Sequence, residues 1–190
     1  MTQRISAKLP TAFGEFTLIS FPNGDDFHPH VVLLNKNWKT TPTVRIHSEC
    51  LTGDALGSLR CDCGHQLHHA QQYIQEHGGA ILYLRQEGRG IGLNEKIKAY
   101  ALQDQGHDTV SANIALGHPA DARDYEWVKE ILTELNFTTF HLITNNPAKI
   151  EALTSMGFQI EKVIASPNNR NPHNAHYLDV KRDQMGHQLG

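Results

Sequence analysis

The chain has 190 residues, of which 39% are hydrophobic and 19% charged, values that are ordinary for a globular protein. Its formal net charge of −3 excludes the overall basic excess with which nucleic-acid-binding proteins hold a phosphate backbone. No segment approaches the length and apolarity of a membrane span, and the N-terminus lacks the apolar core of a signal peptide. We therefore expect no nucleic-acid partner, no membrane contact, and a reducing cytoplasmic location.

Strand patterns dominate the first fifty residues. Residues 13–21 alternate loosely between apolar and polar side chains, residues 22–29 are rich in turn formers, and residues 30–35 are apolar again. This order predicts an antiparallel hairpin. A third strand is expected over residues 43–48, and it leads directly to the first cysteine, Cys50.

Strands and helices alternate through the rest of the chain. Helices are expected over 64–77, 93–106, 121–136 and 147–157, strands over 80–84, 140–144 and 158–164, and a loop over 166–176 before a short helix over 177–189. Alternation of this kind is typical of an α/β layer. We predict one domain over residues 1–190, of mixed α/β (α+β) class. Its mixed sheet is flanked by helices and carries the N-terminal antiparallel hairpin, and residues 165–190 form a loop and a short C-terminal helix.

All cysteines of the chain lie in one short segment with the pattern C-x10-C-x-C: Cys50, Cys61 and Cys63. Thiolates suit zinc, and a structural zinc site closes with four protein ligands whereas a catalytic site keeps one position open for water. Three cysteines therefore favour the open kind, although His47 and His65 are near enough in sequence to supply a fourth ligand. Three inert core cysteines are the alternative. It is disfavoured because Cys61 and Cys63 flank the charged Asp62.

A glycine-rich segment, RQEGRGIG over residues 85–92, follows the expected strand at 80–84. It lacks the third spaced glycine of a dinucleotide-binding fingerprint. It fits phosphate better, because glycines expose backbone N–H groups and the forked guanidinium groups of Arg85 and Arg89 suit phosphoryl oxygens, with Lys96 and Lys98 adding charge. The alternative is a turn that needs glycines, with solvated arginines around it.

Polar clusters follow three of the expected strands, over residues 47–50, 85–92 and 144–146. Open α/β sheets gather ligands at the carboxyl ends of their strands, so we expect these clusters to meet. Asp121 alone is interpreted as a charge favourable to the dipole of the helix expected over 121–136. A three-thiolate metal beside an arginine-rich loop indicates metal-dependent hydrolysis of a phosphorylated small molecule.

Four segments in this order and spacing closely resemble the GTP cyclohydrolase II family: SECLTGDALGSLRCDCG, YLRQEGRGIGL, AYALQDQG followed by DT, and LITNNPAKIEAL. The resemblance runs from about Lys8 to the MGH near the C-terminus. It implies an enzyme that opens the imidazole ring of GTP and releases formate and diphosphate. The product is 2,5-diamino-6-ribosylamino-4(3H)-pyrimidinone 5′-phosphate, the first intermediate of riboflavin biosynthesis.

The resemblance also implies roles for individual residues. Cys50, Cys61 and Cys63 would hold one Zn2+ per subunit of a homodimer, and Glu87, Gly88 and Arg89 would meet the GTP phosphates and their Mg2+. The other implied substrate contacts are Arg45, Ile46, His47, Ser48, Glu49, Gln66, Thr109, Thr144 and Lys149. Tyr100 would act near the reacting ring and Asp121 as proton acceptor, which reverses the interpretation from sequence alone.

Arg123 corresponds to the residue described in the family as the nucleophile that attacks the α-phosphate. A guanidinium is a poor nucleophile while it is protonated, so we expect Arg123 instead to stabilise charge on the transferring phosphoryl group.

Two other classes compete with this interpretation. A zinc-containing nucleic-acid-binding module would need a fourth ligand and a basic face, and the cysteine count and net charge argue against it. A relative that binds GTP, or opens the ring without removing formate, is disfavoured because Tyr100, Asp121 and Arg123 are all present.

Overall fold

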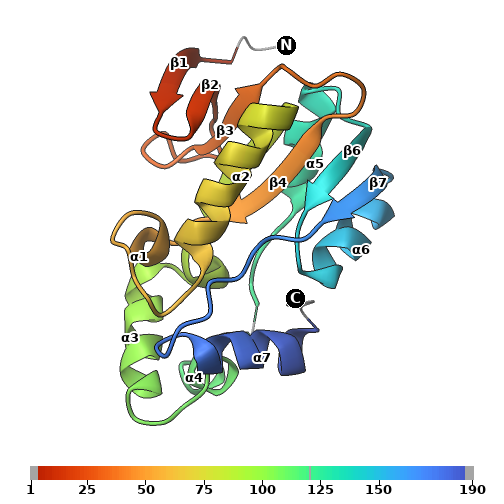
Figure 1. Cartoon of the computed structure of the whole chain (residues 1–190). Helices are drawn as coiled ribbons and strands as arrows, with labels where there is room; N and C mark the ends of the chain where they lie inside the picture. The colour runs from red at the N-terminus through yellow and green to blue at the C-terminus, as the bar shows by residue number, and fades with distance from the viewer. Residues whose placement is uncertain (1–3, 120, 187–190) are drawn as a thin grey trace.

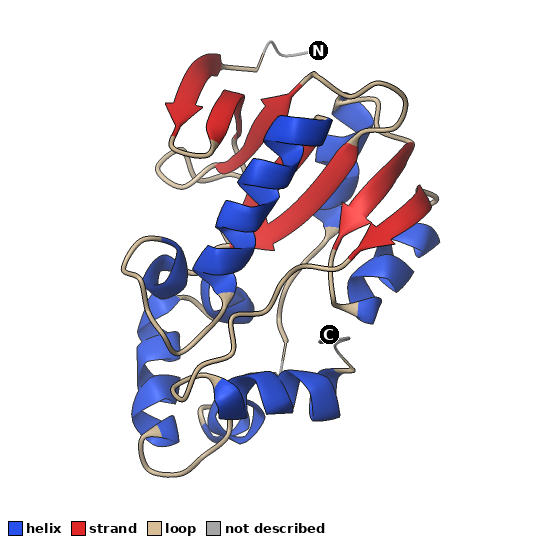
Figure 2. Cartoon of the chain, in the orientation of Figure 1, coloured by secondary structure: helices blue, strands red, loops and turns tan. Residues whose placement is uncertain are grey.

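A seven-stranded mixed sheet, in the order β1-β2-β3-β5-β4-β6-β7, forms the centre of the molecule (Figures 1 and 2). The computed structural model describes residues 4–119 and 121–186. The strands are β1 (Ser6–Thr11), β2 (Gly14–Phe21), β3 (His30–Asn35), β4 (Thr43–Ser48), β5 (Gly79–Leu84), β6 (Thr139–Ile143) and β7 (Gln159–Ile164). The helices are α1 (Leu51–Asp54), α2 (Cys63–His77), α3 (Leu93–Gln103), α4 (Thr109–Ala115), α5 (Glu126–Glu134), α6 (Pro147–Ser155) and α7 (Ala175–Met185), with a 3-10 turn η1 (Glu87–Gly90).

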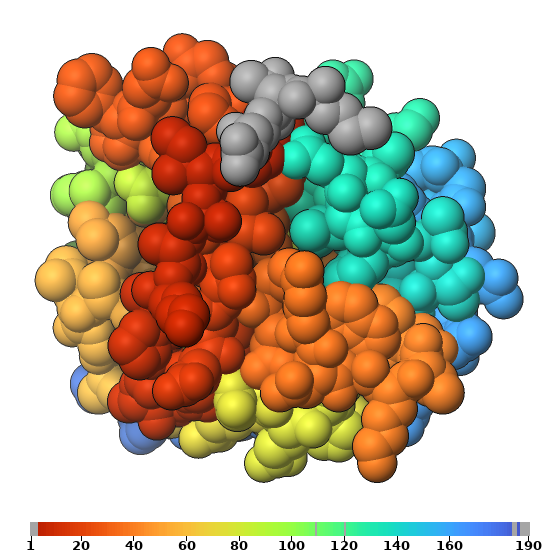
Figure 3. Space-filling model, turned by 90° about the horizontal axis from the view of Figure 1, so that it is seen from above, coloured from red at the N-terminus to blue at the C-terminus, as the bar shows by residue number. Residues whose placement is uncertain are grey.

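The N-terminal half of the sheet is antiparallel. β2 pairs with β3 as the predicted hairpin, and β3 then joins β5, also antiparallel. β1 was not predicted; its residues are mostly exposed and include Pro10, so its sequence carries little alternation. β1 nevertheless pairs with β2 along its whole length, from Ser6 opposite Ile19 to Thr11 opposite Gly14. Figure 3 shows this red N-terminal region on the surface of the molecule, at the end opposite the helices α3 and α7.

The C-terminal half of the sheet is parallel, because β4 pairs with β5 and β6, and β6 pairs with β7, all in the same direction. The glycine pair after α2 makes the turn into β5 that this arrangement needs. Gly79 has φ +137°, and a Cβ there would lie 1.9 Å from the carbonyl oxygen of Thr43 on β4. Only glycine therefore allows the two backbones to approach so closely.

Both faces of the sheet are covered, which is why β5 is a continuous apolar run. Ile81 packs on one side with Ala70 and Ile74 of α2. Leu82 packs on the other side, in the larger cluster that contains Val128 and Leu132 of α5. Helix α2 and helix α5 accordingly lie on opposite faces in Figure 1. The predicted mixed sheet with flanking helices and an N-terminal hairpin is confirmed.

Several details differ from the sequence prediction. The helix expected over 121–136 begins only at Glu126, so Asp121 lies in a loop and the helix-dipole interpretation of its charge is wrong. The short helices α1 and α4 were not predicted. α3 ends at Gln103, three residues before the predicted end at residue 106. α7 ends at Met185, and residues 187–189 of the predicted closing helix lie outside the described residues.

Helices α1, α3, α4 and α7 gather beyond the carboxyl ends of β4 and β6, away from the N-terminus (Figure 1). This is the end of the sheet at which polar clusters were expected to meet. Within the described residues, no helix is both long enough and apolar enough to cross a membrane.

Candidate active site

A crevice opens in the sheet between β4 and β6. Their ladder contains only Thr43 paired with His141 and Val44 paired with Leu142, so the strands are unpaired beyond this point. The chain leaves β4 for β5 through α2, and reaches β6 through α5 on the opposite face. Open α/β sheets bind ligands at the point where the connections from two neighbouring strands pass to opposite faces of the sheet. Arg45 of β4 reaches across, and its Nη1 donates to the carbonyl oxygen of Ile143, 3.2 Å away.

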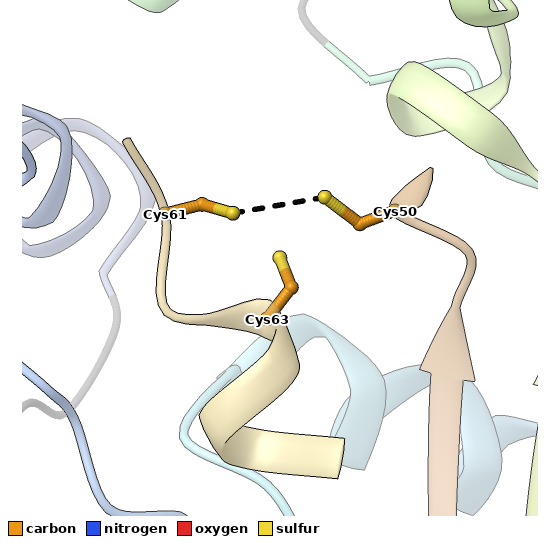
Figure 4. A group of neighbouring side chains, drawn as sticks. All are labelled: Cys50, Cys61 and Cys63. Atoms are coloured by element: carbon orange, nitrogen blue, oxygen red, sulfur yellow. Dashed lines mark hydrogen bonds between the residues drawn. The ribbon is translucent and has the colours of Figure 1, made fainter. Parts of the chain in front are cut away.

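The three thiols converge at the edge of this crevice. Cys50 lies two residues after the end of β4, Cys61 lies two residues before α2, and Cys63 is the first residue of α2 (Figure 4). The Cys50 and Cys61 sulfurs are 3.7 Å apart, and all three sulfurs lie within 4.8 Å of one another. Hydrogen bonds from the other two thiols, together with the ammonium of Lys96, hold the pKa of Cys50 far below its usual range.

This arrangement fits a zinc ion. Two thiolates on one tetrahedral zinc stand about 3.8 Å apart when each Zn–S bond is about 2.3 Å, and a disulfide would need about 2.05 Å between sulfurs. The space is also kept clear by Gly53, where a Cβ would lie 2.7 Å from the Cys61 sulfur and 3.2 Å from that of Cys50. Among the described residues, the group able to hold a metal consists of these thiols alone. Three thiolates would fill three of the four positions of a tetrahedral zinc and leave the fourth open for water.

Neither histidine proposed as a fourth ligand joins this group. His47 is buried, and its Nε2 lies 3.0 Å from Oδ2 of Asp54. Asp54 also accepts hydrogen bonds from the backbone N–H of Cys50 and from the hydroxyl of Tyr83. Burial lowers the pKa of His47, so its ring is neutral at pH 7 and supports the thiolate loop through Asp54. His65 is exposed and contacts Asn169.

Lys96 connects the thiols with the glycine-rich segment. Its Nζ lies 3.1 Å from the Cys50 sulfur and 2.8 Å from Oε1 of Glu87. Oε2 of Glu87 accepts from the backbone N–H of Leu51 at 2.7 Å. Glu87 thus fastens η1 to α1, and Lys96 places a positive charge beside a metal-binding sulfur. Lys98, which was predicted to add charge to the phosphate-binding segment, is exposed and pairs with Glu95.

The glycine-rich segment adopts an unusual backbone at η1. Gly88 and Arg89 both have φ of 62°, and Gly90 packs against the 121–124 loop so closely that a Cβ would lie 2.7 Å from the carbonyl oxygen of Ala122. Arg89 lines the pocket. Arg85 does not line this pocket, and its Nη1 pairs with Glu49 at 2.8 Å. The prediction from the sequence that Arg85 binds phosphate is therefore not supported.

Four basic side chains from four different segments face the same pocket: Arg45, Arg123, Lys149 and Lys181. Within the described part of the chain, Arg45 and Lys149 form no ion pair, and Lys149 Nζ donates to the carbonyl oxygen of Ile46 at 2.7 Å. Burial, reinforced by the charges of Arg45, Arg123 and Lys181, holds the pKa of Lys149 well below its usual range. Because these four cations are not all paired with carboxylates, this side of the pocket, the cationic wall, can bind an anion.

Asp121 and Arg123 form a pair at the mouth of the pocket, with Arg123 Nε 2.8 Å from Oδ1 of Asp121. Burial raises the pKa of Asp121, but the hydrogen bond and charge of Arg123 outweigh it and lower the pKa overall. Tyr100 of α3 lines the same pocket as Arg123. Its hydroxyl is 3.4 Å from that of Thr52, the guanidinium of Arg60 lies over its ring, and burial raises its pKa.

The structure brings most of the expected residues to one pocket. Those that line it are Arg45, His47, Ser48, Glu49, Cys50, Cys61, Cys63, Gln66, Glu87, Gly88, Arg89, Tyr100, Arg123, Thr144 and Lys149. Ile46 instead belongs to the hydrophobic core, and Asp121 reaches the pocket only through Arg123. Thr109 begins α4, and its side chain lies outside the described ones.

The sequence did not indicate several further lining residues, notably Arg60, Asn113, Tyr177 and Lys181. Asn145 and Asn146, from the polar cluster after β6, line it as well. Tyr177 and Lys181 were missed because α7 carries no recognisable motif. Their i, i+4 spacing, which places both on one helix face, is the signal that was available.

An open three-thiolate site beside a cationic crevice defines a metal-dependent hydrolase class acting on a phosphorylated small molecule. Comparison with known proteins gives the family. The model of the GTP cyclohydrolase II family matches residues 2–165. The chain belongs to that family.

Curated relatives agree over nearly the whole chain. The GTP cyclohydrolase-2 of Acinetobacter baumannii (strain AB0057) is 54% identical over 187 residues, which are 96% of this chain and 93% of that protein. The GTP cyclohydrolase-2 of Escherichia fergusonii is 51% identical over 97% of this chain and 94% of that protein. The riboflavin biosynthesis protein RibBA of Cytophaga hutchinsonii is 49% identical over 98% of this chain and 47% of that longer protein.

Proposed function

We propose that this chain is a GTP cyclohydrolase II, which opens the imidazole ring of GTP with release of formate and diphosphate, the first step of riboflavin biosynthesis. The observation that carries the proposal is that the three thiols and the cationic wall line one pocket. Ring opening and phosphate release act on two ends of one substrate, so both sets of groups must reach it together. Family membership supports the same conclusion.

Cys50, Cys61 and Cys63 would hold the zinc. When bound, zinc would lower the pKa of a coordinated water and so make a hydrolytic nucleophile available at neutral pH. Tyr100 lies beside these thiols, and because burial raises its pKa, its hydroxyl stays protonated and can donate to the reacting ring. Asp121 stays ionised because its pKa is lowered, so its carboxylate can accept a proton.

Arg89, Arg123 and Lys149 are assigned to the triphosphate. The guanidinium of Arg123, held in place by Asp121, stabilises negative charge while the diphosphate leaves. Its pKa is raised above the usual arginine value: burial lowers it, but the hydrogen bond and charge of Asp121, together with the nearby tyrosines, outweigh burial. A guanidinium that stays protonated supports a charge-stabilising role over a nucleophilic one.

Mg2+ would accompany the triphosphate, because it prefers phosphate oxygens as ligands. Glu87, Gly88 and Arg89 line the pocket and would meet the phosphates and this ion. Arg45, His47, Ser48, Glu49, Gln66 and Thr144 complete the nucleotide pocket. We assign Ile46 an indirect part, because its carbonyl oxygen positions Lys149, and we retain Thr109 as a substrate contact on the resemblance alone.

We also propose that the enzyme is a cytoplasmic homodimer. Several large apolar side chains on the α1–α2 loop and on α3 and α4 are exposed in the single chain: Leu56, Leu59, Ile97 and Ile114. Light scattering at micromolar concentration tests the assembly, and a mass equal to 21.3 kDa would refute it.

The activity is tested by incubating zinc-loaded protein with GTP and Mg2+ and measuring formate, diphosphate and the pyrimidine separately. We expect equal amounts of all three, and loss of formate in Cys61→Ser. Diphosphate without formate from the wild-type chain would contradict the ring-opening half of the proposal. GTP binding with no product at all would leave a nucleotide-binding relative instead of an enzyme.

A further inference from the structure

Helix α7 contributes to the pocket although neither the sequence motifs nor the family resemblance placed a site residue on it. Tyr177 and Lys181 both line the pocket, and the Lys181 ammonium lies 4.4 Å from the centre of the Tyr177 ring. The side chain of Lys181 is only 10% exposed. A buried lysine is costly unless its charge is matched, so its partner indicates what it does.

That partner is Asp62, which lies between two of the zinc cysteines. Lys181 Nζ is 2.8 Å from Oδ1 of Asp62, and Asp62 is completely buried. The other carboxylate oxygen accepts a hydrogen bond from Gln66 Nε2 at 2.6 Å. The pair therefore fastens α7 to the Cys61–Cys63 turn and to the first turn of α2.

The network continues from Gln66 into the crevice. Oε1 of Gln66 accepts from Arg45 Nη2 at 2.7 Å, and Arg45 Nη1 donates to Ile143 at the end of β6. A carboxylate only accepts and a guanidinium only donates, so the Gln66 amide has one satisfactory orientation. Removing the Lys181 charge would leave Asp62 buried with no opposite charge in direct contact. The groups that depend on Asp62 would then lose their fixed positions.

We infer that Lys181 is a positioning residue for the substrate site: through Asp62 it fixes the Gln66 amide and the Arg45 guanidinium for the bound nucleotide. Lys181 makes this contribution from a helix that lies beyond the residues matched by the family model. The inference rests on the proposed function for the identity of the nucleotide, GTP, but not for the network itself.

The test combines a charge deletion with its compensation. Lys181→Met is compared with Lys181→Arg, which keeps the charge, and with the double variant Lys181→Met/Asp62→Asn, which removes both buried charges while an amide oxygen remains for Gln66. Arg182→Met is the matched control, because Arg182 is the next residue on α7 and its side chain is 53% exposed. Zinc content, melting temperature, KM and kcat for GTP, and the Kd of a non-hydrolysable GTP analogue are measured for each.

Lys181→Met is expected to raise KM and the analogue Kd at least tenfold, with a smaller change in kcat and with zinc retained. The arginine variant and the double variant should recover to within about threefold of wild type, and Arg182→Met should match wild type. Unchanged KM and Kd in Lys181→Met would overturn the inference, and so would a double variant that binds the analogue no better than Lys181→Met.

Two of these variants keep the test decisive if Lys181→Met does not fold. Lys181→Arg and the double variant each leave no unmatched buried charge, and both are predicted to bind the analogue. Loss of binding in both would overturn the inference. If the wild-type chain released no formate, the proposed function would fail while the Kd series would still report on Lys181.

Discussion

Replacing Lys149 by methionine should raise the stability of the free protein and weaken its binding of GTP. Lys149 is buried among other cations, and the structure describes only a backbone carbonyl, that of Ile46, as its hydrogen-bond acceptor. Methionine keeps a similar unbranched shape without the charge. The proposed role in phosphate binding gives the functional half of the prediction.

The sign of the effect and its pH dependence follow from the lowered pKa of Lys149. Lysine ordinarily titrates at 10.5, and burial lowers this value in the folded chain. Each unit of lowering costs about 1.4 kcal/mol of folding free energy at a pH below both values. Because the unfolded chain binds the proton more tightly, wild-type stability rises as the pH increases from the folded-state pKa towards 10.5. The advantage of methionine is therefore greatest at neutral pH and disappears above that range.

Replacing a buried charge by an apolar side chain of similar shape stabilises proteins by about 1–4 kcal/mol. Loss of the hydrogen bond to Ile46 offsets about 1 kcal/mol of this, so we expect a net gain of about 1–2 kcal/mol. This corresponds to a rise in Tm of about 2–8 °C for a chain of this size. KM for GTP should increase about 10- to 100-fold, because a charge-assisted hydrogen bond to phosphate contributes about 1.5–3 kcal/mol.

Calorimetry at pH 7 and pH 10 and steady-state kinetics measure both halves of the prediction. Lys129→Met is the control, since Lys129 is exposed on α5 and lies outside the pocket. A lower Tm than wild type at pH 7 would refute the argument about the buried cation. An unchanged KM would separate Lys149 from phosphate binding.

Substitutions at three further positions test the thiolate loop and the cationic side of the pocket. Gly53→Ala places a Cβ 2.7 Å from the Cys61 sulfur, so bound zinc should fall well below one per chain. A chromogenic chelator measures the zinc, and full occupancy would contradict the proposed packing. Asp54→Asn weakens the hydrogen bonds that the Asp54 carboxylate accepts from His47, Cys50 and Tyr83. It should lower the free energy of unfolding in urea by about 1.5–3 kcal/mol, whereas Asp26→Asn, at an exposed position, should leave it unchanged. Arg123→Lys should retain about 1–10% of diphosphate release and Arg123→Met far less. Equal loss in both would argue against charge stabilisation.

The sheet was largely predictable because its strands obey local rules. The strands of residues 30–35 and 43–48 were predicted with the bounds that the structure has, since apolar runs end there at turn residues. β1 was missed because an exposed edge strand needs no apolar alternation. α4 was missed because its seven residues depend on a local cap: Asp108 accepts from the backbone of Val110 and Ser111.

The convergence of the three thiols was predictable from residue type and spacing, because soft donors in one short segment have few other uses. The positions of the charged residues were not. Arg85 and Arg89 look alike in sequence, yet Arg85 is turned to Glu49 while Arg89 lines the pocket. Lys96 and Lys98 differ in the same way, because residues two apart on a helix face different directions. Lys181 needed the tertiary structure, since its partner is 119 residues away.

The two edges of the sheet bear on how copies of this chain can associate. β1 exposes Lys8 and Pro10, and β7 exposes Glu161 and Lys162. Proline offers no N–H to an incoming strand, and charged side chains disfavour a neighbour stacked in register. Both edges therefore resist the strand addition that leads to aggregation, even though their backbones are open. A dimer of this chain should form through its helices and loops, without merging two sheets into one.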